Sequence, residues 1–246
     1  CQYCPQPTLV QAYRVGGSTG KVMALADFAA CLAKLPTNVY VTFAGYAEPW
    51  LNEACTDMVE LAANTHQVAI YTTLTGMTEA DLDRLSRFRF RHFCIHLPDS
   101  LGRMRLVVDE AYLRRLQLAN QIPGRNFVAY GSLHPEARRV LGFDVRDDSA
   151  GLISRGGNVT SLKIAPKSGA LKCTSCGPKL DHNVLLPDGR VAICCMDYSL
   201  DHVIGNLLTN SYESLFESDE YRRVLAGLRQ DGAGTLCRKC EISSPA

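Results

Sequence analysis

The sequence predicts an α/β protein: a partial TIM-like barrel of (β/α)6 type followed by a small cysteine-rich module made of a β-hairpin and a helix. Apolar strand-like segments alternate with amphipathic helical segments from residue 38 to about residue 160. The strand–helix unit recurs about every 25 to 35 residues, as right-handed crossovers between parallel strands require. Beyond residue 160 this rhythm ends, so we expect one domain over residues 1–160 and another over residues 161–246.

Each element of the expected barrel has its own local pattern. The segments typical of buried strands are residues 38–45, 66–73, 91–97 and 126–131. The segments with helical periodicity are residues 25–36, 52–64, 77–88 and 110–121. Pro36 ends the first helix, and Thr78 with Asp81 has the pattern of a capping box. We expect Cys1 to Cys4 to lie in a loop between a strand upstream of this sequence and the first helix.

The second module is shorter and richer in turns. Residues 182–186 and 190–194 are apolar runs joined by Pro-Asp-Gly, which predicts a hairpin. Residues 211–230 predict one helix, and a C-x-x-C pair, Cys237 and Cys240, follows it.

Composition and charge exclude several classes of partner. The chain has 246 residues, 46% of them hydrophobic, and a formal net charge of +1 with acidic and basic residues interspersed. No single-signed field suggests a nucleic-acid groove or an anionic membrane surface. No apolar run approaches the roughly 20 residues that span a bilayer. We therefore expect a soluble, cytoplasmic protein that binds neither nucleic acid nor membrane.

Eleven cysteines are distributed unevenly along the chain. Cys31, Cys55 and Cys94 are isolated in apolar surroundings and are expected to be buried small hydrophobic residues. A disulfide scaffold is disfavoured, because such scaffolds belong to small secreted domains that lack a hydrophobic core. The paired and clustered cysteines therefore point to a metal.

The unusual segments of the first half all follow predicted strands. In parallel α/β folds, chemistry collects in the loops at the carboxyl ends of the strands. We expect one edge of the sheet to gather five such segments: residues 1–6, 44–50, 72–77, 96–100 and 131–136.

Four cysteines of the second half have the arrangement of a metal site. Cys176 and Cys194 bracket the hairpin, while Cys237 and Cys240 follow the helix. A module with few apolar residues needs a central group to hold three separate segments together. Zinc and an iron–sulfur cluster both suit four thiolates, and the spacing alone does not choose between them.

Taken together, these motifs resemble the radical S-adenosylmethionine superfamily with a C-terminal SPASM or twitch-type domain. That family holds a [4Fe–4S] cluster with C-x-x-x-C-x-x-C, and Cys1, Tyr3 and Cys4 match its latter part. The first cysteine would lie four positions upstream of Cys1, outside this sequence. Residues 44–50 resemble the family's Gly-Gly-Glu-Pro segment, with Glu48 and Pro49 matching and Tyr46 and Ala47 in place of the glycine pair.

The C-terminal half adds fragments in the order of the SPASM/twitch family. They are residues 154–159, the cysteine-flanked hairpin, residues 202–207 and the final C-x-x-C. The interval of eighteen residues from Cys176 to Cys194 fits that pattern. Each fragment is weak by itself, and their order makes the resemblance specific.

The resemblance implies an enzyme that cleaves S-adenosylmethionine reductively to a 5′-deoxyadenosyl radical, which abstracts hydrogen from a substrate C–H bond. The implied ligands of the first [4Fe–4S] cluster are Cys1 and Cys4 with the upstream cysteine. The implied cofactor-binding residues are Tyr3, Tyr46, Ala47, Glu48, Pro49, Thr72, Thr73, His96, Ser132 and Arg155. Asp99, His134 and Asn158 share these segments, and each histidine has an alternative role as a structural residue. The implied electron donor is a flavodoxin or ferredoxin.

An auxiliary [4Fe–4S] cluster would be held by Cys176, Cys194, Cys237 and Cys240, and it would accept an electron from the substrate. The family then suggests net oxidation of a small polar metabolite, such as a sugar or aminocyclitol. Cys173 and Cys195 are left over as alternative ligands or hydrogen donors. Modification or epimerisation of a peptide is an alternative of the same class, and a zinc-held structural or interaction protein is an alternative of another class.

Overall fold

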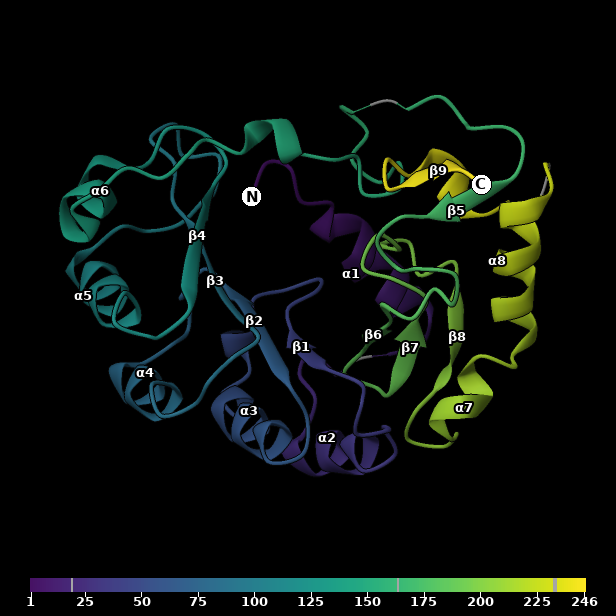
Figure 1. Cartoon of the computed structure of the whole chain (residues 1–246), viewed down its shortest axis with the longest axis horizontal. Coiled ribbons are helices and arrows are strands. Elements are labelled where there is room, and N and C mark those ends of the chain that lie inside the picture. The colour runs from purple at the N-terminus through teal and green to yellow at the C-terminus, as the bar shows by residue number, and fades with distance from the viewer. Residues whose placement is uncertain (19, 163, 232–233) are drawn as a thin grey trace. The chain divides into compact units, whose positions relative to one another are not determined.

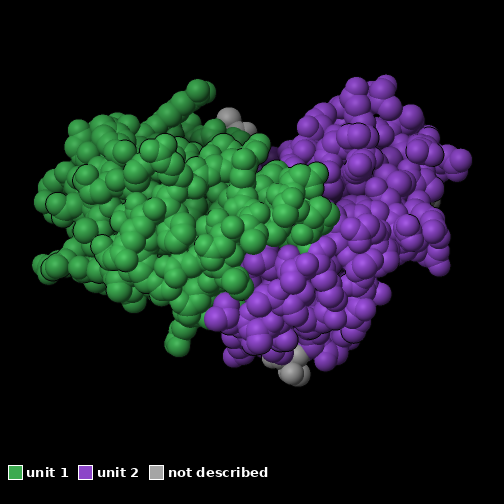
Figure 2. Space-filling view, turned by 60° about the horizontal axis from the view of Figure 1, so that its bottom comes forward, with its two compact units in different colours: residues 1–3, 35–152 green, residues 4–34, 153–246 purple. Residues whose placement is uncertain are grey.

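The chain forms two compact units in a computed structural model that describes residues 1–18, 20–162, 164–231 and 234–246 (Figure 1). The sheet unit contains Cys1–Tyr3 and Leu35–Leu152, and the cysteine unit contains Cys4–Lys34 and Ile153–Ala246. Figure 2 colours the sheet unit green and the cysteine unit purple. The division of the chain at residue 160 into two sequence-defined domains stays a prediction.

The sheet unit is built on four parallel strands, ordered as they occur in the chain: β1 (Val41–Phe43), β2 (Val68–Thr72), β3 (His92–Leu97) and β4 (Arg125–Ala129). The first three strands fall within the segments that the sequence predicts, and β4 begins one residue before its predicted segment. Of the six strands expected, the described residues form these four as an extended parallel sheet. A single parallel bridge from Ala129 to Asp147 continues the sheet beyond β4.

Helices cover one face of this sheet, as Figure 1 shows for the segments between the strands. They are α3 (Cys55–Ala63), α4 (Glu79–Leu85), α5 (Glu110–Ala119) and α6 (Pro135–Leu141). Ile70, Phe93 and Ile95 are fully buried, and so are Leu85 and Leu116 on the helices. Because side chains alternate across a strand, Tyr71, Cys94 and His96 are placed on the opposite face of the sheet.

Local sequence explains where these helices begin. The hydroxyl of Thr78 accepts the Asp81 N–H, and the Asp81 carboxylate accepts the Thr78 N–H, which confirms the predicted capping box. Asp109 caps α5 by accepting the Tyr112 N–H at 2.7 Å. The ring of His134 caps α6 by accepting the Glu136 N–H at 3.3 Å. These caps orient the crossover helices against the sheet.

The cysteine unit contains two small sheets. The predicted hairpin is present as β6 (Val184–Leu185) and β7 (Arg190–Ala192), and β8 (Val203–Asn206) extends it to three antiparallel strands. Gly189 turns the hairpin with φ +83°, where a side chain would collide with Leu208. A second sheet pairs β5 (Leu171–Cys173) with β9 (Ser243–Pro245).

The single helix expected over residues 211–230 is wrong, because the structure divides it into α7 (Tyr212–Leu215) and α8 (Asp219–Arg229). Ser218 causes the break: its hydroxyl accepts the Tyr221 N–H at 3.2 Å and so begins a new helix. The helix expected over residues 25–36 is also shorter than expected: α2 spans Leu25–Leu32, and Ala33 is its C-cap residue.

A helix that the sequence pattern did not predict, α1 (Gln6–Val15), follows the N-terminal cysteines and belongs to the cysteine unit. Two contacts connect the segments that follow α1 and α2 to the residues around β7 and β8 of the same unit. The ammonium of Lys34 donates to the backbone carbonyls of Leu207 and Asn210 at 2.5 and 3.0 Å. The hydroxyl of Ser18 donates to the Asp188 carboxylate. Three further short helical turns are Pro49–Leu51, Ser149–Gly151 and Leu236–Lys239.

Among the described residues, no helix combines the length and the apolar character that spanning a membrane requires.

Candidate functional site

Six cysteines of the cysteine unit line one cavity. They come from three places: the end of β5 with the residues that follow it, the segment after β7, and the turn Leu236–Lys239 with its flanks. The six are Cys173, Cys176, Cys194, Cys195, Cys237 and Cys240. The structure therefore brings together the four cysteines predicted as ligands of the auxiliary cluster, together with the two that the prediction left over.

Burial shapes the acidity of these thiols. Burial is the main cause that raises the pKa of Cys237 to about 11, and it also raises the pKa of Cys194 and Cys240. The Cys173 thiol differs, because hydrogen bonding to Cys176 lowers its pKa and raises that of Cys176. Metal ligation requires the thiolate, so positive charge must enter this cavity before most of these cysteines ionise.

The donor set fits an iron–sulfur cluster. Soft thiolates on several sides of one buried cavity have the chemistry that such a cluster requires.

Two cations, the half-buried Lys167 and the buried Arg238, link the C-x-x-C turn to neighbouring segments. The Lys167 ammonium donates to the carbonyls of Cys240 and Ser243, the first at 2.7 Å. The guanidinium of Arg238, only 7% exposed, donates to the carbonyls of Gly169 and Gly227 at 2.5 and 2.7 Å. Neither residue is predicted from the sequence, since a lone basic residue carries no signal of the contacts it makes.

In the sheet unit, the loop after β1 is fixed by Glu48. Its carboxylate accepts hydrogen bonds from the Thr72 hydroxyl and from both the N–H and the hydroxyl of Thr73, each at 2.7 Å. Burial raises the pKa of Glu48, and these hydrogen bonds oppose the rise. Three residues predicted to bind the cofactor thus contact one another at the ends of β1 and β2.

Aromatic rings form a row on the face of the sheet that α3–α6 leave uncovered. The ring centroids of Tyr3 and Tyr130 are 5.3 Å apart, those of Tyr130 and His96 are 5.8 Å apart, and those of His96 and Tyr71 are 6.4 Å apart. Cys94 lies on the same face and accepts the Asn126 amide at 3.4 Å. The row gathers the predicted residues Tyr3 and His96 with two tyrosines that sequence reasoning missed.

The isolated cysteines behave as expected from the sequence. Cys31, Cys55 and Cys94 are 1–2% exposed. Burial raises the pKa of all three, that of Cys94 to about 11. The interpretation of these residues as small buried hydrophobes is confirmed.

The N-terminal cysteines fall in different units. Cys1 and Tyr3 belong to the sheet unit, where the Gln2 N–H donates to the Arg103 carbonyl at 3.0 Å. Cys4 belongs to the cysteine unit and precedes α1. Cys1 is exposed and Cys4 is half-buried. Their role as ligands of a first cluster stays a prediction.

The remaining residues predicted to bind the cofactor in the sheet unit lie in two places. Tyr46, Ala47 and Pro49 flank Glu48 in the loop after β1, and Tyr46 is buried. Ser132 is exposed after β4, and its carbonyl accepts the Ser100 N–H at 2.8 Å. Asp99 has a structural role, because its carboxylate accepts hydrogen bonds from three backbone N–H groups of its own loop. These belong to Leu101, Arg103 and Met104.

Arg155 lies in the cysteine unit. Its guanidinium favours the charged forms of Cys195 and Tyr198, although burial is the larger effect and raises the pKa of both. Asn158 donates to the carbonyls of Arg155 and Met196 at 2.9 and 3.2 Å, which fixes the loop of residues 154–159 beside the cysteine cavity. Cofactor binding by Arg155 stays a prediction.

Comparison with known proteins agrees with this geometry. Residues 173–241 match the model of the SPASM family, described as an iron–sulfur cluster-binding domain. All six cysteines of the cavity fall within this match. No curated protein sequence matches the chain.

Solved structures share the fold at low identity. A crystal structure of BtrN in complex with AdoMet and 2-DOIA aligns with a TM-score of 0.64 and 18% identity, over 98% of this chain and 87% of that one. Native anSMEcpe with bound AdoMet aligns with a TM-score of 0.55 and 13% identity, over 92% of this chain and 80% of that one. The resemblance proposed from the sequence is confirmed for the fold by these structures and for residues 173–241 by the family match.

Proposed function

From a chain that carries a SPASM iron–sulfur cluster-binding domain and shares the fold of BtrN and anSMEcpe, we propose a radical S-adenosylmethionine enzyme that oxidises a small polar metabolite. The cavity lined by six cysteines carries this proposal, because a second cluster gives a substrate-derived electron somewhere to go. The AdoMet present in both related structures supports the same cofactor here.

The proposed reaction balances as the loss of two hydrogens from a secondary alcohol. When bound, the cofactors would supply one-electron chemistry: S-adenosylmethionine and one electron would become methionine and 5′-deoxyadenosine, and the 5′-deoxyadenosine would carry the hydrogen atom taken from the substrate. A second electron would leave the substrate for the auxiliary cluster. The alcohol proton passes to a base, and the product is a ketone. Cys176, Cys194, Cys237 and Cys240 would hold the auxiliary cluster, and Cys1 and Cys4 would contribute to the first.

Side chains of the sheet unit would bind and orient the reactants. Glu48, already fixed by Thr72 and Thr73, keeps the loop after β1 in place at the carboxyl edge of the sheet. His96 and its neighbouring tyrosines present a surface of rings and polar atoms suited to a neutral polar molecule. Orientation is this unit's main contribution, since a carbon radical reacts with the nearest C–H bond.

The test uses the protein expressed with any residues that precede Cys1 in its reading frame and reconstituted anaerobically with iron and sulfide. We expect a brown protein with about eight irons that releases 5′-deoxyadenosine from S-adenosylmethionine on reduction. Candidate alcohols deuterated at single carbons should then transfer label into 5′-deoxyadenosine. Label from one alcohol and formation of its ketone would identify the substrate.

Two other outcomes would point to the alternatives. Label transferred from a peptide, with no small alcohol active, would favour peptide modification; anSMEcpe, which shares the fold, has been crystallised with a peptide. A colourless protein with stoichiometric zinc and no 5′-deoxyadenosine would favour a zinc-held structural protein.

A further inference from the structure

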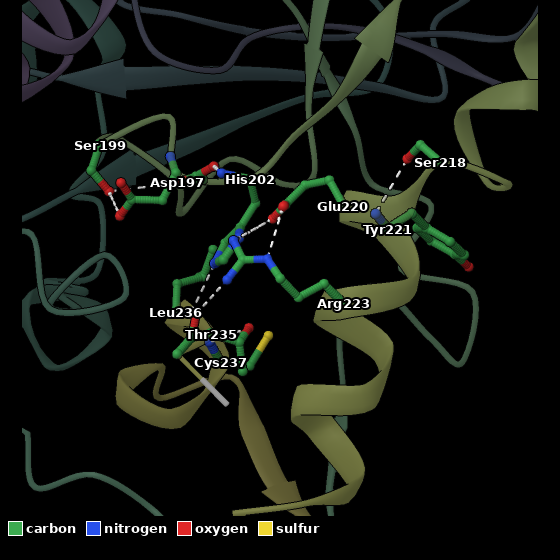
Figure 3. Close-up of polar contacts among 12 residues, drawn as sticks. Asp197, Ser199, His202, Ser218, Glu220, Tyr221, Arg223, Thr235, Leu236 and Cys237 are labelled. Atoms are coloured by element: carbon green, nitrogen blue, oxygen red, sulfur yellow. Dashed lines mark hydrogen bonds and ion pairs between the residues drawn. The ribbon is translucent and has the colours of Figure 1, made fainter. Parts of the chain in front are cut away.

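The C-x-x-C turn is attached to a buried histidine on another segment of the cysteine unit. His202 is 2% exposed, and its Nε2 accepts the Leu236 N–H at 3.2 Å, one residue before Cys237 (Figure 3). Because a backbone N–H only donates, Nε2 carries no proton in this arrangement. The ring proton is therefore on Nδ1.

A carboxylate on α8 fixes that tautomer. Nδ1 lies 2.6 Å from Glu220 Oε1, so its N–H donates to the carboxylate. Arg223 donates to the same carboxylate at 2.7 and 2.9 Å and holds it in place, as Figure 3 shows. Arg223 Nη2 also lies 3.3 Å from Nδ1, but the proton already on Nδ1 leaves that nitrogen no lone pair to accept.

The other side of His202 is tied to the segment that carries Cys194. The buried Asp197 carboxylate accepts the N–H of His202 at 2.8 Å and that of Asp201 at 3.0 Å. The Asp197 N–H in turn donates to the Cys194 carbonyl at 3.2 Å. One continuous set of hydrogen bonds thus runs from Cys194 through Asp197 and His202 to the residue before Cys237.

Other side chains also contact this end of the turn: the Ser243 hydroxyl donates to the Cys237 carbonyl at 2.6 Å, and Arg223 Nη1 donates to the Gly234 carbonyl at 3.5 Å. The Thr235 hydroxyl accepts the Cys237 N–H at 3.5 Å, a long contact. The stronger anchors, Lys167 and Arg238, act on carbonyls at the far end of the turn and on neighbouring segments. Among the described residues, the His202 contact is a link of hydrogen bonds between the start of the turn and the Cys194 segment.

We propose that His202 is a positioning residue that sets the separation of Cys194 and Cys237, and thereby the metal affinity of the cysteine cavity. This inference rests on the proposed cluster site and adds a residue that contacts no metal. Removing an outer hydrogen-bond partner of a metal site commonly weakens metal binding by about 10- to 100-fold.

The test compares His202→Asn with His202→Gln. The glutamine side chain places an amide oxygen near the position of Nε2 and can still accept the Leu236 N–H, whereas asparagine reaches only the position of Nδ1. Arg222→Gln is the matched control: Arg222 is on α8, and its side chain, 64% exposed, forms an ion pair with the fully exposed Asp219. All variants are made in the whole chain with Cys1 and Cys4 replaced by alanine, so that the metal binding measured is that of the cysteine cavity.

The probe is Co²⁺, whose thiolate charge-transfer absorption gives a dissociation constant without iron. We expect His202→Asn to raise the constant about 10- to 100-fold, and His202→Gln and Arg222→Gln to stay close to the parent. Unchanged Co²⁺ binding in His202→Asn would overturn the proposal. Equal weakening in the Asn and Gln variants would also overturn it, because the lost ring rather than the lost acceptor would then be responsible.

A second variant keeps the test decisive if His202→Asn does not fold. Glu220→Ala leaves the imidazole ring in place but no longer fixes the proton on Nδ1, so we expect weaker Co²⁺ binding, as in His202→Asn. Unchanged binding would contradict the inference.

Reconstituted wild-type protein separates the proposed function from the role of His202. Absence of 5′-deoxyadenosine release would contradict the proposed function, whereas the Co²⁺ series decides the role of His202 by itself.

Discussion

The Glu48 carboxylate and the Thr72 hydroxyl, 24 residues apart in the chain, meet at 2.7 Å where β1 and β2 end. Parallel pairing brings these two ends to the same edge of the sheet. The contact joins a segment that resembles a cofactor-binding motif to the neighbouring strand.

Replacing Glu48 with glutamine should destabilise the protein. The glutamine NH2 group only donates, so it would face the Thr73 N–H or a threonine hydroxyl that donates to the carboxylate in the wild type. One buried donor would then have no acceptor, at a cost of about 1–3 kcal/mol. Glu53→Gln, at an exposed position of the same loop, is the control. Denaturant unfolding of both variants measures the difference, and equal midpoints would contradict the assigned contacts.

The same residue predicts a pH dependence. Burial raises the folded-state pKa of Glu48 above its ordinary value of 4.5, so its stabilising contribution is complete below that value and is lost as pH rises through the folded pKa. The free energy of unfolding of the wild type, minus that of Glu48→Gln, should therefore fall as pH increases across this window. A difference that stays constant or grows with pH would argue against a raised pKa.

Gly76 should not tolerate a side chain. It has φ +81°, and an added Cβ would collide with the Trp50 carbonyl group, whose carbon would be 2.8 Å away. Gly102 has φ +65° with no atom within 4 Å, so Gly102→Ala shows the cost of the backbone conformation alone, about 1–2 kcal/mol. Gly76→Ala should lower the free energy of unfolding by more than Gly102→Ala. Equal losses would show that the loop after β2 can move away from Trp50.

The six cysteines of the cavity should divide into ligands and non-ligands. Alanine at Cys176 or Cys240 should remove the auxiliary cluster, whereas alanine at Cys173 or Cys195 should leave its iron and sulfide content unchanged. Iron and acid-labile sulfide analysis, with electron paramagnetic resonance of the reduced protein, checks this division. Retention of the cluster in Cys176→Ala together with its loss in Cys173→Ala would assign the ligands the other way.

Lys167→Met should loosen the C-x-x-C turn. The ammonium donates to the Cys240 and Ser243 carbonyls, and its removal takes a charged donor from both, at a cost of about 1–3 kcal/mol. The Cys240 carbonyl keeps its bond from the Ser243 hydroxyl at 2.9 Å. Lys172→Met changes an exposed lysine on β5 and serves as control. Faster iron loss to a chelator in Lys167→Met alone is the expected result, and equal rates in both variants would contradict it.

Much of the architecture was predictable from local patterns. The alternation of strands and helices predicted β1 to β4 and the helices between them, since a parallel strand covered on both faces is a short, nearly continuous apolar run, as the consecutive buried residues of β2 and β3 show. The Thr78–Asp81 pair predicted a helix start, because side-chain capping is a local interaction. The break at Ser218 was missed, because the periodicity of residues 211–230 continues through a serine that is itself a strong cap.

The sequence by itself determined the kinds of chemistry present: soft thiols in pairs, a glutamate after a strand and a turn-rich second half. Only the tertiary structure decided which of these groups meet. It placed six cysteines on one cavity, enclosed Glu48 among threonine donors, and joined His202 to Leu236 across 34 residues. The physical reason is that burial and hydrogen-bond partners depend on contacts between distant segments, while composition and periodicity report only on neighbours along the chain.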